Sequence, residues 1–183
     1  MIPPRGFQTG ARSLLVTPSD LLSVAGAMIC RVGVLYGYYA AADDRDAVSA
    51  VVRADDQPVG TGFDQLVIKG IDPAIELLPA EALIMGRDHD EVTADPRRCA
   101  LIGMVGDGEV VAVSLTDTFR DELACFDKTL LNDVAVGWAR SPQAFYGTAD
   151  PDPYILADFL ADLAGLATRA RTAGHRLYCW ICP

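Results

Sequence analysis

The chain has few basic residues, and they do not gather into a stripe. It carries 15 Lys and Arg against 25 Asp and Glu, which gives a formal net charge of −10. The largest closely spaced group is Arg169, Arg171 and Arg176 near the C-terminus. A nucleic-acid-binding protein needs clustered basic side chains to replace the counterions of the phosphates. We therefore expect neither nucleic acid nor an anionic membrane surface as a partner, which leaves a basic protein or a small molecule.

The sequence also lacks the run of ~18 to 20 apolar residues that a membrane-spanning helix needs. The first 30 residues look like a short export signal, because Arg5 and Arg12 precede an apolar run from Leu21 to Cys30. Ser23 interrupts that run, and Ile29 stands where a processing site prefers a small residue. The sequence therefore predicts a non-secreted, cytoplasmic protein that does not span a membrane.

Cysteine is present five times, at an odd count and wide spacing that do not suit a disulfide-stapled domain. His175, Cys179 and Cys182 are the candidate metal ligands, but a structural zinc site usually has a second ligand pair at comparable spacing, and none is visible. In a strand, residues three apart point to opposite faces, so the two sulfurs would diverge. We therefore predict packing cysteines and no metal.

Signatures of catalysis are equally scarce. The chain has two histidines, and no serine lies in a G-x-S-x-G elbow. The glycine pairs around Thr61 and Asp107 lack the strand-to-helix context and the lysine of a phosphate-binding loop, so both indicate turns. The sequence thus predicts no catalytic residue and no cofactor.

The remaining composition is that of a globular domain, with 51% apolar and 22% charged residues in a chain of 183. Residues 1–30 form a poorly patterned N-terminal extension, whereas residues 31–183 have the patterning of a single domain. The stretch from Val32 to Tyr39 is β-branched and aromatic, which predicts a buried strand, and residues 175–182 predict a final strand.

Between these ends, turn and capping residues divide the chain into short elements. A helix is expected after Asp43, and two short helical pieces are expected on either side of Pro79, one starting at Asp72-Pro73 and one running to Met85-Gly86. A long helix with one apolar stripe, from Ile155 to Ala170, ends at Gly174. The other expected elements are a strand within 63–71, a helical turn within 88–94, a hairpin over 99–115, two amphipathic helices over 116–138 and a loop over 141–153. The sequence predicts an α+β fold whose N- and C-terminal strands lie in one small, mainly antiparallel sheet, with several short helices and a long C-terminal helix packed on it.

Two groups of residues are candidates for binding. Tyr36, Tyr38 and Tyr39 of the first strand, with Tyr178 and Trp180 of the last, would line one face if these strands pair. The alternative is that they are core residues. Lys69 and Asp72 flank a glycine in an apolar stretch, where a charged pair marks either a pocket or a solvated turn.

From Gly33 onward the layout resembles the uncharacterised bacterial YfbM-like domain family, and it is similar to short actinobacterial hypothetical proteins. The similarity covers about 150 residues. The matching segments are Gly33 to Tyr39, Lys69 to Asp72 leading to Leu83 to Gly86, Val113 to Trp138, and the closing helix into Gly174 to Trp180. The resemblance implies an α+β domain of unknown activity and carries over no catalytic residue. The N-terminal extension departs from it.

Negative charge and missing catalytic signatures together favour a non-enzymatic protein-interaction or regulatory domain. An immunity-type protein, which binds another protein, is one example of such a domain. The alternative is a small-molecule-binding protein or an enzyme that uses an aromatic-lined pocket. The sequence gives no oligomeric state.

Overall fold

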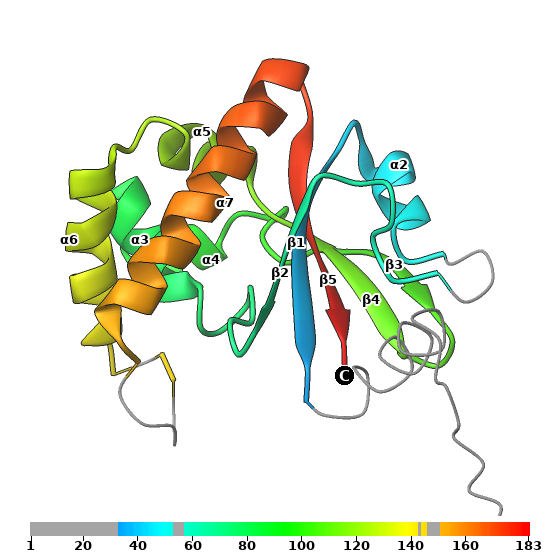
Figure 1. Cartoon of the computed structure of the whole chain (residues 1–183), viewed down its shortest axis with the longest axis horizontal. Helices are drawn as coiled ribbons and strands as arrows, with labels where there is room; N and C mark the ends of the chain where they lie inside the picture. The colour runs from blue at the N-terminus through cyan, green and yellow to red at the C-terminus, as the bar shows by residue number, and fades with distance from the viewer. Residues whose placement is uncertain (1–32, 53–56, 143, 146–150) are drawn as a thin grey trace, which may run out of the picture.

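In the part of the chain that the structure describes, five strands, all antiparallel, form one open sheet in the order β2-β1-β5-β4-β3. A computed structural model describes residues 33–52, 57–142, 144–145 and 151–183 (Figure 1). The strands are β1 (Leu35–Ala41), β2 (Gln65–Lys69), β3 (Leu101–Val105), β4 (Val110–Ser114) and β5 (Arg176–Cys182). The predicted N-terminal extension lies outside the described residues.

The first and last strands pair at the centre of the sheet, as predicted. Leu35 of β1 opposes Cys182 of β5, and the register continues to Ala41 opposite Arg176. β2 closes one side and the β3–β4 hairpin extends the other, so β2 and β3 are the two edges (Figure 1).

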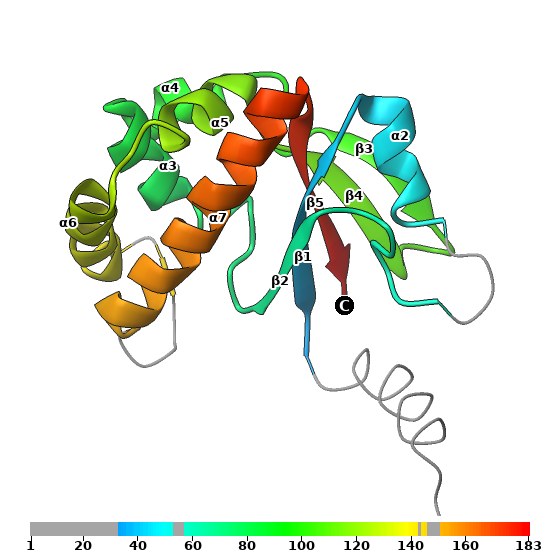
Figure 2. The ribbon, with the colours of Figure 1, turned by 45° about the horizontal axis from the view of Figure 1, so that its top comes forward.

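A group of helices covers one face of the sheet, and a short helix lies on the opposite face (Figures 1 and 2). The helices are α2 (Asp44–Ser49), α3 (Leu78–Met85), α4 (His89–Thr93), α5 (Asp117–Leu123), α6 (Lys128–Ala139) and α7 (Pro153–Ala173). The larger core joins α3, α5, α6 and α7 to the sheet, whereas α2 and the chain after it enclose the smaller one. The α+β prediction, including the long C-terminal helix packed on the sheet, is confirmed.

The C-terminal end of α7 at Gly174 is the one predicted, whereas the helix begins at Pro153, within the loop predicted for residues 141–153. The Asp152 carboxylate accepts a hydrogen bond from the backbone N–H of Tyr154, and Pro153 occupies the first turn. Gly174 ends the helix in the left-handed conformation, with φ of 70°. The predicted apolar stripe is wrong at Ile155, whose side chain is 63% exposed, whereas that of the next residue, Leu156, is 2% exposed. No helix among the described residues is long and apolar enough to cross a bilayer.

The helix predicted from Asp72-Pro73 is also corrected. The Asp72 carboxylate accepts hydrogen bonds from the backbone N–H groups of Ala74 and Ile75, which closes an isolated turn. The second predicted piece is α3, which runs to Met85 with Gly86 as its C-cap. It begins at Leu78, so Pro79 lies in its first turn, where a missing N–H costs nothing.

Candidate functional site

The predicted aromatic wall is divided between the two faces of the sheet. Tyr36 and Tyr38 point into the helix-covered core, whereas Tyr39, Tyr178 and Trp180 point into the core beneath α2. The strands do pair, but Tyr38 and Tyr39 are consecutive and must alternate across the pleat. All five are buried, so they line no common surface.

Tyr36 and Asp72 are brought together, whereas Lys69 is not. Burial and the neighbouring Asp72 carboxylate raise the pKa of Tyr36 to about 12, which keeps this phenol protonated. The Tyr38 hydroxyl donates to the backbone carbonyl of Ile71 at 2.8 Å. Lys69 lies at the exposed end of β2, and no ion pair joins it to Asp72 among the described residues. These tyrosines and Asp72 therefore anchor the turn at 72–77 to the sheet.

The three candidate metal ligands do not converge. The Cys179 side chain lies in the helix-covered core and that of Cys182 in the opposite core, as expected for residues three apart in a strand. His175 precedes β5 and its backbone carbonyl accepts a hydrogen bond from the Arg120 guanidinium. Within the described residues, no three His, Cys, Asp or Glu side chains are placed to hold one ion.

Tyr178 belongs instead to a polar cluster that links α2 to the sheet. Its hydroxyl donates to the Asp44 carboxylate at 2.8 Å, and Arg97 donates to the same carboxylate at 2.9 and 3.2 Å. These hydrogen bonds, that from Arg97 first, lower the pKa of Asp44. Asp44 is the first residue of α2, where a negative charge also favours the helix dipole. The cluster therefore stabilises the fold.

A buried ion pair that sequence reasoning missed lies beneath the turn at 72–77. The Arg98 Nε donates to Glu81 Oε2 at 2.6 Å, and the two side chains are 6% and 1% exposed. The Arg98 guanidinium also donates to the backbone carbonyls of Pro73 and Ala74. Glu81 Oε1 is buried and has no hydrogen-bond partner among the described residues.

The ionisation of Glu81 is finely balanced as a result. Burial raises the pKa of Glu81 to about 7, against the opposing effect of the Arg98 charge. Its neighbour Cys99 has a left-handed backbone, with φ of 53°, and burial raises the pKa of the Cys99 thiol to about 11. A thiol held protonated at neutral pH is a poor nucleophile. The Glu81–Arg98 pair can bind a proton, but the burial of both side chains leaves no room for a substrate beside them.

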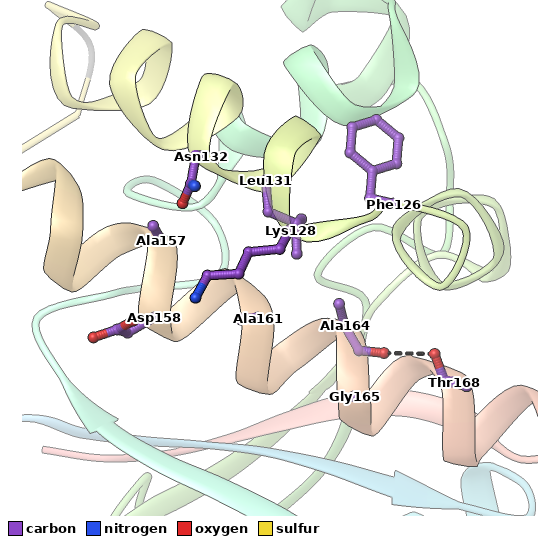
Figure 3. A pocket seen from close by; sticks show the side chains of 10 residues that line it. All are labelled: Phe126, Lys128, Leu131, Asn132, Ala157, Asp158, Ala161, Ala164, Gly165 and Thr168. Atoms are coloured by element: carbon purple, nitrogen blue, oxygen red, sulfur yellow. Dashed lines mark hydrogen bonds between the residues drawn. The ribbon is translucent and has the colours of Figure 1, made fainter.

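A hollow of about 350 Å³ lies between α6 and α7 (Figure 3). Its α7 side is made of small residues, and the Lys128 side chain extends across it toward Asp158 (Figure 3). The volume suits a small ligand, but the polar groups at the rim do not converge on one point. A second hollow, of about 660 Å³, lies beside α3 and the start of α4. Neither is lined by the predicted aromatic residues.

The edge strand β3 presents an apolar strip to solvent. Leu101 and Met104 are 63% and 55% exposed, and half-buried Val111 and Ile181 continue the strip across β4 and β5. The main contacts of β3 are with β4 and with α2, which covers the other face, so the helices leave this part of the sheet open. We call Leu101, Met104, Val111 and Ile181 the β3 strip.

Edge strands of monomeric proteins are usually guarded by a charge, a proline or a bulge. β2 has Gln65 and Lys69 at its ends, whereas β3 reads Leu-Ile-Gly-Met-Val, has no charge and no proline, and carries one bulge between Leu101 and Gly103. The hairpin was predicted from the sequence, and its uncharged outer strand is the signal that could have marked the edge.

Comparison of the chain with models of known families, with curated proteins and with solved structures gave no match.

Proposed function

We propose that the chain is a non-catalytic protein-interaction domain that binds a strand of another polypeptide at the β3 edge. The observation that carries this proposal is the β3 strip, an exposed apolar row along an edge with no charge or proline to block pairing. In strand addition, backbone hydrogen bonds supply affinity and alternate side chains supply specificity.

The charge of the chain favours a partner with basic residues beside the paired segment. Asp107 and Glu109 are exposed in the turn that follows β3, and the whole chain has a formal net charge of −10. A basic flank would steer the encounter and would meet this acidic turn. The regulatory or immunity-type role expected from the sequence requires the same kind of partner.

A photo-crosslinking residue placed at Met104 tests the proposal directly. In extract from the source cells, we expect a crosslink to an extended segment of a protein, and mutation Leu101→Lys should abolish it. Ile155→Lys is the matched control, because Ile155 is also 63% exposed but lies on α7. Crosslinks that are absent, or that persist in Leu101→Lys, would refute strand addition at this edge.

The alternative, a small-molecule-binding protein or an enzyme, is tested by thermal-shift screening against metabolites. A ligand that binds only the folded state raises the melting temperature. The hollow between α6 and α7 is where such a ligand would fit (Figure 3). A ligand whose effect is lost in Asn132→Trp, which would fill that hollow, would favour this alternative.

We also propose a reducing, cytoplasmic location and membership of the YfbM-like family. Cys99, Cys125 and Cys179 form no disulfide, which suits a compartment that keeps thiols reduced. Fractionation of the source cells tests the location. An alignment of sequences that link this chain stepwise to members of the YfbM-like family tests the family.

A further inference from the structure

We infer that the first partner of the β3 edge is the β3 edge of a second copy of this chain, paired antiparallel about a two-fold axis. The inference rests on the proposed function and specifies the polypeptide that the edge takes up. It is carried by the pattern of β3 itself, by the exposure of its side chains and by the charges at its two ends.

A bulge gives β3 a face pattern that reads the same in both directions. Leu101 opposes Val113 and Met104 opposes Val111, with one extra residue of β3 accommodated between Leu101 and Gly103. Leu101 and Met104 therefore point to the helix-covered side although they are three residues apart. Ile102 packs into the core beneath α2, and a Cβ placed on Gly103 would meet Val48 of α2, so both central residues face the other side.

Antiparallel self-pairing with Leu101 opposite Met104 therefore matches face for face. In this register Ile102 of each copy opposes Gly103 of the other, and both face the α2 side. The exposed Leu101 and Met104 of the two copies form one continuous apolar row on the helix-covered side. Because cross-strand neighbours on one face are in contact, each of these four side chains would lose much of its exposure to solvent. A bulge normally discourages pairing at an edge, but here both strands carry the same one.

The ends of the strand have opposite charge, which suits the antiparallel arrangement. Arg97 precedes β3 and keeps 26% of its side chain exposed while it binds Asp44. Asp107 and Glu109 follow β3 and are exposed. In the antiparallel arrangement the acidic turn of each copy lies toward the end of the partner's β3 that Arg97 precedes, whereas a parallel arrangement would place the two acidic turns together.

Sedimentation of the full chain over about 1 to 200 µM tests the inference, a range that suits the modest affinity of a small edge interface. We expect a reversible monomer–dimer equilibrium. Leu101→Lys and Met104→Lys should each raise the dissociation constant at least tenfold, because each substitution places a charged side chain opposite an apolar one at both symmetry-related positions. All three positions, including the control Ile155→Lys, are more than half exposed, so the variants should fold.

Ile155→Lys should leave the dissociation constant of the wild-type chain unchanged. A chain that remains monomeric throughout, or a dimer that Leu101→Lys does not weaken, would overturn the inference. If the chain is a monomer but still crosslinks from position 104 to a different protein, the proposed function stands and only the self-pairing is wrong. If it is a monomer and gives no such crosslink, both the self-pairing and the proposed function are wrong.

Discussion

The buried carboxyl group of Glu81 makes folding stability depend on pH in a direction that can be tested. Its pKa is raised from 4.5 to about 7 by burial in the folded chain, where Arg98 and Asp95 are the charged groups that act on it. The folded state therefore binds this proton more tightly than the unfolded state. Between pH 4.5 and 7 the folded state holds more protons, so the free energy of unfolding falls as the pH rises.

The size of the effect follows from the shift. A shift of about 2.5 pH units corresponds to about 3 kcal/mol, at 1.36 kcal/mol per unit. Ionisation of Glu81 should therefore remove about 3 kcal/mol of stability by pH 7, with little further change above it. Asp44, Asp64 and Asp121 have lowered pKa values and act in the opposite sense, but at acid pH, below the window in which Glu81 titrates.

Substitution Glu81→Gln isolates this contribution because the amide keeps the shape and does not titrate. Urea unfolding of both chains, followed by tryptophan fluorescence from pH 4.5 to 7.5, gives the difference in unfolding free energy. This difference should move by about 3 kcal/mol in favour of the variant as the pH rises. Glu109→Gln, which removes an exposed carboxylate, should leave the slope unchanged. Parallel curves for wild type and Glu81→Gln would refute this account of the Glu81–Arg98 pair.

Three further substitutions test the packing. Gly37→Ala should destabilise the fold by about 1–3 kcal/mol in urea unfolding, because a Cβ at Gly37 would lie 2.0 Å from the ring of Trp180. Gly165→Ala, in the interior of α7, should instead stabilise the chain by up to about 1 kcal/mol, since its Cβ would meet only the flexible end of Arg169. A double-mutant cycle of Asp64→Ala and Arg169→Ala should give a coupling below about 1 kcal/mol, because this surface pair is 47% and 59% exposed. The contact described at each position would be contradicted if Gly37→Ala left the stability unchanged, if Gly165→Ala lowered it, or if the coupling of Asp64 and Arg169 exceeded about 1 kcal/mol.

Local signals in the sequence predict most of the fold. Asp43, Asp88 and Thr116 each cap a helix through a side-chain hydrogen bond, and Gly174 ends α7, because these residues satisfy backbone groups without long-range help. Asp72 carries the same capping signal but serves an isolated turn. Two carbonyls of that turn accept hydrogen bonds from Arg98, which is distant in sequence and which no local signal reveals.

The candidate site is harder to predict, because it depends on which face of the sheet each side chain occupies and on which strands lie at the edges of the sheet. The aromatic character of β1 and β5 is visible in the sequence, but the division of Tyr38 and Tyr39 between two cores follows from the pleat once both faces are covered. The Glu81–Arg98 pair joins residues 17 apart that no local pattern links. The exposure of Leu101 and Met104 follows from the position of β3 at the end of the strand order, which only the tertiary structure reveals.

Hydrogen exchange at the two edges of the sheet tests the central claim most directly. As the concentration of the full chain is raised, the backbone amides of residues 101–105 should exchange more slowly, while those of residues 65–69 at the other edge should not change. Leu101→Lys should remove the slowing. The assignment of β3 as the binding edge would be contradicted if exchange at residues 101–105 did not change with chain concentration or with an added binding partner. It would also be contradicted if residues 65–69 became protected instead.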